Sequence, residues 1–508
     1  MLFNSIEFLG YFLPVVWLVW RLLSLTRNRE LVIGWLSLSS LAFYAYWNWH
    51  YAPLLLLSLV VNYAAGCSLA ARPRRWLLAT GLVWNLGLLG YFKYFNFFVS
   101  NVDTLTGWNW PLRNIVLPLG ISFFTFQKIA FLVDAWRRKI GQTRFGDFAL
   151  FVLFFPQLIA GPIVHHGDFI PQLSDPSWLR FNPQRFARGL ILFSAGLFCK
   201  TVIADTLAPI ADSAFGLVNA EFNLRLFEAW VGVLAYGLQL FYDFAGYSYM
   251  ALGLALLFGL TLPVNFFGPY ASRSIIEFWR RWHITLSAFL RDYVYIPFGG
   301  NRQGLSKQIR NLLITFLLAG LWHGAGCTFI LWGLWHGVAL AINHFWRRAH
   351  PPAEGSEKSF SIGGLVLTTL AVQIGWVLFR APNLRVVGEL GGSLFGLHGI
   401  SVPVALTAWV DALAPVVRPQ GWFPNLYVTP SRLAVFFLSA VFAIVGPTLL
   451  AWLGCSCADV AAPPPLVRDS LSRAPTQPNW WQAAIAGGML ALSLAALSRS
   501  APFLYFQF

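Results

Sequence analysis

Two Trp-His-Gly units, Trp322-His323-Gly324 and Trp335-His336-Gly337, lie within apolar stretches of the sequence. Apart from His323 and Arg310, the run Ile309–Ile330 contains no His, Lys, Arg, Asp or Glu. A neutral imidazole is the natural general base near pH 7, so His323 is a candidate catalytic residue. The alternative is a packing histidine that donates a hydrogen bond to a backbone carbonyl. Spacing alone does not decide between these two interpretations.

The second unit is not expected to repeat the role of the first. On one continuous helix the 13-residue offset turns the two histidines about 220° apart, so they cannot ligate one metal unless the helix breaks. Gly324-Ala325-Gly326 is a candidate break. Because no acidic or thiolate set has metal-ligand spacing, we predict no metal site. His336 is expected to be structural, or to support residues that contact substrate.

A third cluster runs from Glu277 to Tyr293 and combines arginines with aromatic rings. On one helix, Arg280, His283 and Ser287 fall at i, i+3 and i+7 and share a face. Guanidinium groups beside aromatic planes suit a phosphorylated ligand that carries an aromatic ring, such as a nucleotide-type cofactor. The alternative is a juxtamembrane helix that binds lipid phosphates. The candidate donor-binding side chains here are those of Trp279, Arg280, Arg281, Trp282 and Ser287, with Trp322 from the first unit.

Asp243 lies in the otherwise apolar run Gln239–Tyr249. A carboxylate in such a run must face protein or a water-filled cavity. We expect it to pair with an arginine of the 273–291 stretch, either as a structural pair or as a partner in catalysis.

The composition sets the environment in which these residues act. Of 508 residues, 57% are hydrophobic and 11% are charged, against about 25% charged in soluble proteins. This excludes a soluble cytosolic enzyme, a nucleic-acid-binding domain and a disordered chain. The net charge of +15 is expected to lie in cytoplasmic loops that face anionic lipid.

The hydropathy pattern predicts eleven to fourteen membrane segments, since a helical span needs about 20 apolar residues. The candidates lie near 8–26, 31–48, 53–70, 76–98, 115–133, 147–164, 187–208, 227–262 (two spans), 310–346 (two spans or a re-entrant hairpin), 363–380, 432–454 and 482–498. Lys and Arg concentrate in alternate loops of the front half, which places the N-terminus outside the cytoplasm. Prolines predict a re-entrant or interfacial segment near 147–180.

The stretch 268–310 is too charged to span a membrane and too aromatic to be a solvated loop. We predict amphipathic helices that lie at the cytoplasmic face or dip into it. Two stretches have linker composition, Pro351–Phe360 and the Pro-rich loop near 460–478.

The run Glu277–Asn301, followed by the two Trp-His-Gly units, resembles the membrane-bound O-acyltransferase family. The most similar branch is the bacterial one that O-acetylates exported polysaccharides such as alginate. Further matching stretches cover essentially the whole chain, and together they are highly specific. They are Leu117–Phe124, Leu158–Pro162, Gly375–Ala381 and Pro502–Phe508.

The resemblance implies an all-α polytopic fold, a ring of helices around a thinned centre where funnels from both sides meet at a histidine. That histidine maps to His323, with His283 as the second family histidine. It implies a multi-pass protein of the bacterial inner membrane whose probable donor, acetyl-CoA, is not tightly bound. Expected partners are an extracytoplasmic SGNH-type acetyltransferase, the polysaccharide synthesis and export machinery, and membrane lipids, with no nucleic acid.

This assignment divides the chain into a core, 1–380, and an extension, 381–508, with about two further membrane helices. Within the core, 273–325 is the catalytic, donor-facing segment. One departure is Tyr249, where the branch often has an acid. Two alternatives remain: a D-alanyl-transferring relative that acts on teichoic acid, and a transporter with histidines in a proton path. Concentrated charges and the absence of internal repeats argue against the transporter.

Overall fold

The computed structural model describes residues 1–351, 361–402, 417–419, 423–445, 450, 453, 455–456, 459–461, 463–471, 478–499, 501 and 503–504. Most of the predicted linker Pro351–Phe360, parts of the Pro-rich loop near 460–478, and residues 502 and 505–508 of the matching stretch at the end of the sequence lie outside these residues. Helices dominate the described chain, as the composition predicts.

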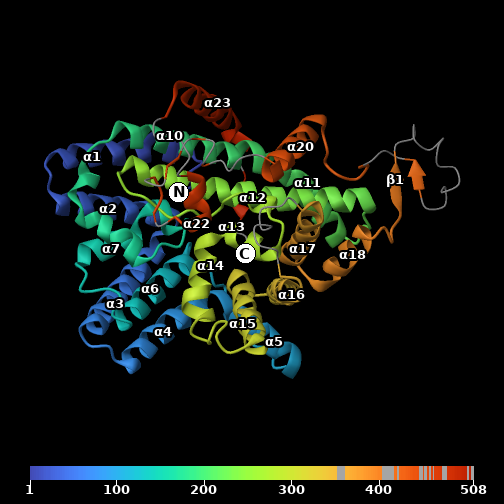
Figure 1. Cartoon of the computed structure of the whole chain (residues 1–508), viewed down its shortest axis with the longest axis horizontal. Helices are drawn as coiled ribbons and strands as arrows, with labels where there is room; N and C mark the ends of the chain where they lie inside the picture. Colours follow the sequence, from blue (N-terminus) through green and yellow to red (C-terminus); the bar gives the residue numbers. More distant parts are fainter. Residues whose placement is uncertain are drawn as a thin grey trace.

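Apart from α5, the helices of the first part of the chain form an apolar bundle at one end of the molecule (Figure 1). Rings of Phe3, Phe8, Phe43 and Phe155 pack together inside it. The elements are the π-helical turn η1 (Glu7–Phe12), α1 (Leu13–Leu25), α2 (Arg29–Trp47), the 3-10 turn η2 (Trp49–Tyr51), α3 (Ala52–Ala71), α4 (Arg75–Leu89), the π-helical turn η3 (Gly90–Tyr94), α5 (Phe95–Thr106) and α6 (Ile121–Trp136).

The segment predicted to be re-entrant, near 147–180, is built from short pieces rather than from one span. Helix α7 (Phe145–Leu153) ends at Phe154, where the backbone leaves the helical region. Pro156 lies in the first turn of the next piece, where proline is tolerated, and Gly161-Pro162 follows it outside any helix. The remaining pieces are α8 (Phe155–Leu158), α9 (His166–Ser174) and the 3-10 turn η4 (Pro176–Leu179).

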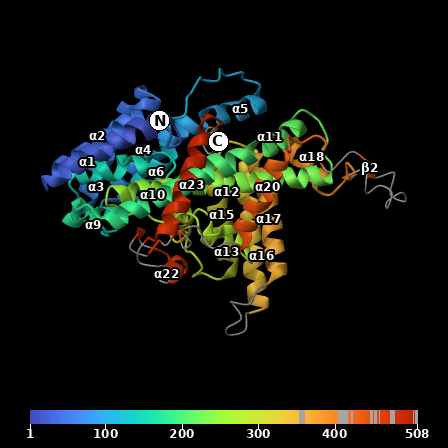
Figure 2. The same ribbon diagram turned by 90° about the horizontal axis from the view of Figure 1, so that it is seen from above.

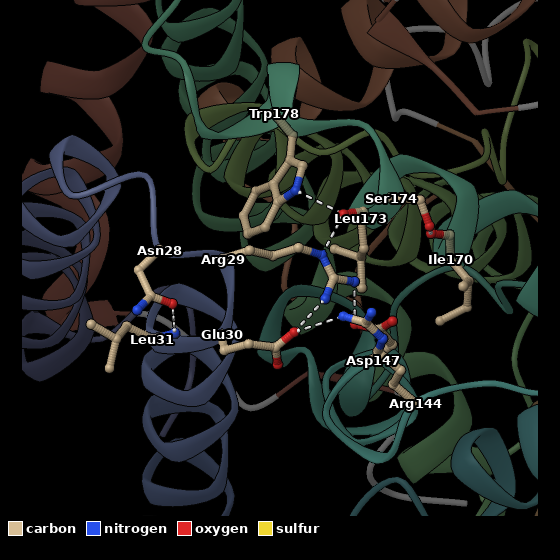
Figure 3. Close-up of polar contacts among 10 residues, drawn as sticks. All are labelled: Asn28, Arg29, Glu30, Leu31, Arg144, Asp147, Ile170, Leu173, Ser174 and Trp178. Carbon is tan, nitrogen blue, oxygen red and sulfur yellow. Dashed lines mark hydrogen bonds and ion pairs between the residues drawn. The ribbon is translucent and has the colours of Figure 1, made fainter.

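A cluster of charged side chains joins these pieces to the start of α2 (Figure 3). Arg29 forms ion pairs with Asp147 and, at 2.9 Å, with Glu30. Its Nε also donates to the Leu173 carbonyl at 2.8 Å, and Arg144 reaches Glu30 at 3.2 Å. We call these four charged residues, Arg29, Glu30, Arg144 and Asp147, the rim cluster. It fixes α2, α7 and α9 to one another.

Helix α12 (Leu226–Leu257) crosses the middle of the molecule, with α10 above it and α13 to α16 below it in Figure 1. The prediction of two spans within 227–262 is wrong, because these residues form one helix of 32 residues. Its interior glycines serve close packing instead of a break. A Cβ on Gly196 of α10 (Pro183–Phe198) would lie 2.5 Å from the Gly246 carbonyl oxygen. The π-helical turn η5 (Cys199–Ala204) and α11 (Asp205–Asn219) follow α10.

The predicted helical pair within 310–346 is present, with its break at Gly324–Gly326. Helices α15 and α16 approach closely, since a Cβ on Gly320 would lie 2.2 Å from the Phe329 carbonyl oxygen. Helix α17 runs beside α16 (Figure 2). This region comprises η6 (Pro269–Ala271), α13 (Ile275–Arg281), α14 (Ile284–Leu290), the π-helical turn η7 (Arg291–Tyr295), α15 (Leu305–His323), α16 (Cys327–Ala349), α17 (Ile362–Arg380) and α18 (Leu384–Leu394).

Two short strands, β1 (Ile400–Val402) and β2 (Val417–Pro419), pair in parallel, with Ile400 opposite Val417. The described residues after β2 include the helices α20 (Pro430–Val445), α22 (Pro465–Leu471) and α23 (Trp480–Ala496), and then the 3-10 turn η11 (Leu497–Arg499). Helices α20 and α23 are the apolar helices expected in the extension, and α23 packs on α10.

Within the described residues, five helical segments are long and apolar enough to cross a membrane. They are Glu7–Leu25, Trp49–Ala71, Pro183–Asn219, Leu226–Leu257 and Ile362–Arg380. Two shorter apolar helices are Pro430–Ile444 and Trp480–Ala496. The chain is an all-α polytopic membrane protein. The larger number of segments and the orientation of the N-terminus stay predictions.

Candidate active site

His323 is the last residue of α15, and the end of this helix is held by side chains from the front half of the chain. The Lys93 Nζ donates to the carbonyls of Trp322 and His323 at 2.5 and 2.9 Å. The Tyr94 hydroxyl donates to the Leu321 carbonyl. The final carbonyls of a helix lack partners within the helix, and a cation is favoured at this end. Lys93 therefore caps α15 at the candidate catalytic residue.

Sequence analysis missed Lys93 and Tyr94 as site residues. Both lie in the π-helical turn η3, which directs them toward α15. One signal was present in the sequence: Lys93 is the only charged residue between Trp76 and Asn101. A cation at the end of such an apolar run must find oxygen partners, and the ends of neighbouring helices supply them.

The His323 ring lies in a box of aromatic side chains. Its centroid is 4.7 Å from that of Trp322, 4.8 Å from Trp332 and 5.1 Å from Phe379. The residue is only 6% exposed. Burial among rings excludes bulk water, which suits acyl transfer because hydrolysis of the donor is then suppressed.

A cavity of about 490 Å³ begins directly after His323. Residues Gly324–Gly326, which separate α15 from α16, form one wall. Lys93, Thr328 and Phe379 contribute to the other walls. The break therefore gives a small molecule a route to the end of α15, which a continuous helix would close.

His283 is the hinge between α13 and α14. It has a left-handed backbone conformation, with φ 44° and ψ 53°. Its Nδ1 lies 3.0 Å from Oδ1 of Asn265. Asn265 also accepts the backbone N–H of Ile284 at 2.9 Å and the Thr285 hydroxyl proton at 3.0 Å. An amide oxygen only accepts, so Nδ1 carries the proton in the neutral ring and Nε2 presents a lone pair.

The two histidines of the catalytic prediction both lie beside Trp322. The Trp322 ring centroid is 6.1 Å from that of His283 and 4.7 Å from that of His323. Within the described residues, the Nε2 of His283 is buried and has no hydrogen-bond partner. Asn265 was not foreseen, because a single Asn in an apolar loop gives no sequence signal for its partner.

The prediction that Arg280, His283 and Ser287 share one helical face is wrong. Helix α13 ends at Arg281, Trp282 is extended, and α14 begins only after His283. The contacts of His283 with Asn265 and its left-handed backbone turn the chain between the two short helices. Arg280 consequently points outward and is exposed, whereas Ser287 lies half-buried on α14.

Arg281 is occupied within the protein. It forms an i, i+4 ion pair with Glu277 at 2.7 Å and donates to the Phe267 carbonyl at 3.4 Å. The i, i+4 spacing of Glu277 and Arg281 in the sequence is that of neighbours on one helical face, and in the structure the two residues pair. Of the two arginines, only Arg280 is exposed to a ligand from outside.

Trp279 and Trp282 are buried in the core and do not form an exposed docking surface. Trp279 packs edge-on against His336 at 5.1 Å and near Phe316 at 4.9 Å. Trp282 packs on Trp376 at 4.9 Å. The short helices α13 and α14 therefore pack their aromatic side chains into the protein, and their position relative to the cytoplasmic face stays a prediction.

His336 lies in the middle of α16 and is fully buried, at 0% exposure. Neither ring nitrogen has a hydrogen-bond partner among the described residues. Its ring fits against Gly375 of α17, where an added Cβ would lie 2.6 Å from Nε2. The described part of the chain has no group of three or more His, Cys, Asp or Glu side chains placed to hold a metal ion.

Asp243 does not pair with an arginine of the 273–291 stretch, so that prediction is wrong. Its partner is Lys200, at 2.9 Å. Lys200 precedes α11 in the π-helical turn η5, next to the middle of α12. Sequence distance hid this pair, because the two residues lie in separate elements, η5 and α12, that come into contact only in the folded chain.

Comparison with known proteins agrees with this geometry. Residues 41–362 match the model of the membrane-bound O-acyltransferase family. The peptidoglycan O-acetyltransferase of Helicobacter pylori is 41% identical over 79% of this chain and 81% of its own length. The "Probable alginate O-acetylase AlgI" of Pseudomonas syringae is 42% identical over 78% of this chain and 75% of its own length. A teichoic acid D-alanyltransferase of Bacillus subtilis is 28% identical over 53% of this chain and 70% of its own length.

The family match covers both short helices of the hinge and both Trp-His-Gly units. The relatives extend the similarity over more than three quarters of the chain. The chain thus belongs to the membrane-bound O-acyltransferase family and is a multi-pass acyltransferase.

Proposed function

We propose that the protein passes acetyl groups from a cytoplasmic thioester, acetyl-CoA, across the membrane for O-acetylation of an exported polysaccharide, with His323 as general base or acyl carrier. The observation that carries the proposal is the capped end of α15. Lys93 fixes the backbone at His323, aromatic rings surround the imidazole, and a cavity begins at the next residue.

The chemistry needs a group that moves one proton. In direct transfer, the acceptor oxygen attacks the thioester carbonyl, the C–S bond breaks, and the hydroxyl proton moves through the imidazole to the departing thiolate. In the carrier form, an imidazole nitrogen attacks the thioester carbonyl, the C–S bond breaks, and the thiol leaves with the imidazole proton. The acceptor oxygen then attacks the acetyl group, the N–C bond breaks, and the hydroxyl proton returns to the imidazole. General-base help of this kind contributes about 10²–10⁴-fold to the rate. His323 supplies it in either form.

His283, which also lies beside Trp322, is a second candidate for moving the proton in this reaction. Because its Nδ1 proton is held by Asn265, the neutral ring offers an acceptor at Nε2. That tautomer suits orienting a hydroxyl or taking up a proton. It does not suit donating a hydrogen bond to the thioester carbonyl. We therefore assign His283 to proton handling, in preference to polarisation of the donor.

Arg280 is the residue that we assign to the donor. It is the exposed arginine of the hinge region, and a guanidinium binds the phosphates of a nucleotide-type thioester. Arg280→Ala should raise KM for acetyl-CoA several-fold with kcat little changed. An unchanged KM would remove Arg280 from the donor site.

The acceptor class comes from the relatives' names, which specify peptidoglycan in one case and alginate in the other. We propose that the protein lies in the inner membrane and that its acceptor is an exported polysaccharide. The alternation of Lys and Arg between the loops of the front half predicts that the N-terminus lies outside. We also propose a separate extracytoplasmic SGNH-type transferase, working with the polysaccharide synthesis and export machinery, as the protein that receives the acetyl group.

Inverted membrane vesicles test the proposal. Radiolabelled acetyl-CoA is supplied outside, and ester-linked acetate is measured in the lumen with wild type, His323→Ala and His336→Ala. Label that needs both His323 and the partner supports relay across the membrane. Label that needs His323 without the partner would mean direct modification of the glycan. No label in well-inserted wild type rejects acetyl-CoA and favours the D-alanyl alternative, whose relatives match about half of this chain.

A further inference from the structure

Three charged side chains that the proposed mechanism does not use lie together inside the helical core. Lys200 forms ion pairs with Asp205 at 2.6 Å and with Asp243 at 2.9 Å. The side chains of Lys200, Asp205 and Asp243 are 3%, 7% and 3% exposed. We call these three residues the core cluster. Such groups are costly to bury, so each carboxylate needs further partners.

Two of these further partners come from residues far along the sequence, 501 and 504. The second oxygen of Asp243 accepts the backbone N–H of Leu504 at 2.8 Å. The second oxygen of Asp205 accepts the backbone N–H of Ala501 at 3.3 Å. The cluster carries two carboxylates and one ammonium, so it has an excess negative charge, and these N–H dipoles point toward it. Hydrogen bonds to charged groups are among the stronger ones in proteins.

The residue between these two donors contacts the wall of the site. Phe503 packs on Tyr247 with ring centroids 4.9 Å apart and on Phe244 at 5.8 Å. Phe244 in turn lies edge-on to the His283 ring at 4.8 Å. A continuous path of contacts therefore runs from the core cluster through Phe503 and Phe244 to His283.

We propose that the core cluster is a clamp that seats the segment at residues 501, 503 and 504 and thereby positions His283 for the transfer reaction. Lys200, Asp205 and Asp243 are positioning residues: they hold backbone donors and touch no reacting atom. The helical fold of α10 to α12 does not require the segment, because glycine contacts already join these helices. The claim about His283 rests on the proposed function, whereas the seating of the segment does not.

The seating is tested without any activity measurement. In Ala501→Cys, a membrane-impermeant maleimide labels residue 501, and mass spectrometry quantifies the tryptic peptide that follows Arg499. Adding Asp243→Asn should raise the labelling rate about tenfold, because the segment loses an ionic partner. Asp147→Asn, in the rim cluster, is the matched control and should leave the rate unchanged. An unchanged rate in Asp243→Asn would overturn the clamp.

A double-mutant cycle then tests the positioning of His283. Leu504→Pro removes the N–H that Asp243 accepts, and Leu504→Ala keeps it. Asp243→Asn and Leu504→Pro should each lower kcat for acetyl transfer about tenfold with KM within twofold. Asp243→Asn removes the charge of the acceptor and Leu504→Pro removes the donor of the same hydrogen bond, so their combination should be no worse than the more damaging of the two. Leu504→Ala should stay within threefold of wild type.

If the loss in kcat of the double variant equals the product of the two single losses, Asp243 acts elsewhere, and the positioning role is refuted. If Asp243→Asn inserts poorly, Asp205→Asn with Ala501→Pro gives an equivalent cycle at the longer bond. Wild type that transfers no acetyl group would reject the proposed function, while the maleimide labelling would still decide whether the clamp exists.

Discussion

The two Trp-His-Gly units have the same three residues in very different environments. His323 ends its helix, has Lys93 on its carbonyl and directly precedes Gly324, which lines a cavity of about 490 Å³. His336 lies in the middle of α16, surrounded by Trp279, Trp332 and the backbone of Gly375. Both rings are buried, but only the first unit has a residue, Gly324, among those that line this cavity.

The difference arises from the backbone, because the tripeptide is the same. After His323, Gly324 is extended and the helix stops, so carbonyls are released that only a cation or hydroxyl from another helix can satisfy. After His336, the helix continues for three turns, and its carbonyls bond within it. A motif search that scores both units equally misses this distinction.

Replacing each histidine by alanine should give the largest difference between the two Trp-His-Gly units. His323→Ala should abolish acetyl transfer, a loss of at least about 10³-fold, because the group that moves the proton or carries the acetyl is removed. His336→Ala should keep kcat within about tenfold and lower thermal stability, since a cavity replaces a buried ring. Transfer is measured in vesicles matched for inserted protein. Normal activity in His323→Ala would refute the catalytic assignment.

Removing the Lys93 side chain that caps α15 should lower the catalytic activity that we assign to the first Trp-His-Gly unit. Lys93→Met keeps the apolar stem but removes two charged hydrogen bonds at the end of α15. The expected loss in kcat is about 10–100-fold, from about 1.5–3 kcal/mol for a hydrogen bond to a charged group. Tyr94→Phe, which removes one neutral donor from the same turn, is the matched control and should lose less than about tenfold. Equal effects of the two variants would mean that the charge of Lys93 does not matter.

The third histidine tests whether a defined tautomer matters beside Trp322. Asn265→Ala frees Nδ1 of His283, so the ring can take either tautomer and rotate. We expect kcat to fall about tenfold, since preorganisation of a catalytic group is lost. Thr285→Val, which removes another hydrogen bond to the same oxygen, should change kcat less. If kcat falls equally in the two variants, Asn265 supports the loop and does not set the tautomer of His283.

Much of this arrangement could be predicted from sequence, and the reasons for the failures are specific. The helix pair around Gly324–Gly326 follows from local residue types, because glycines in an apolar run have few explanations. The catalytic role of His323 came from the family resemblance, since spacing alone left a packing role open, and it stays a prediction. The shared face of Arg280, His283 and Ser287 was wrong, since the left-handed backbone of His283 depends on Asn265. A helical pattern does not show where a distant side chain interrupts it.

Partners between distant helices were the least predictable. Lys200 was invisible as the partner of Asp243, and Lys93 as the cap of α15, because each contact joins residues tens to hundreds of positions apart. The single helix α12 was predicted as two because its length exceeds one span. Its glycines, which resemble helix-breaking signals, serve contact with α10.

The smallest effect on catalysis is expected where the second unit meets α17. Gly375→Ala places a Cβ 2.6 Å from Nε2 of His336, so the ring or α17 must move. Overpacking of this kind costs about 1–3 kcal/mol of stability, while His323 keeps its cap and cavity. Gly363→Ala, in the same helix with no atom within 4 Å of the new Cβ, is the matched control and should leave the melting temperature unchanged. A fall in kcat without a fall in melting temperature would show that His336 communicates with the reacting centre, and the contrast between the two units would then be one of degree.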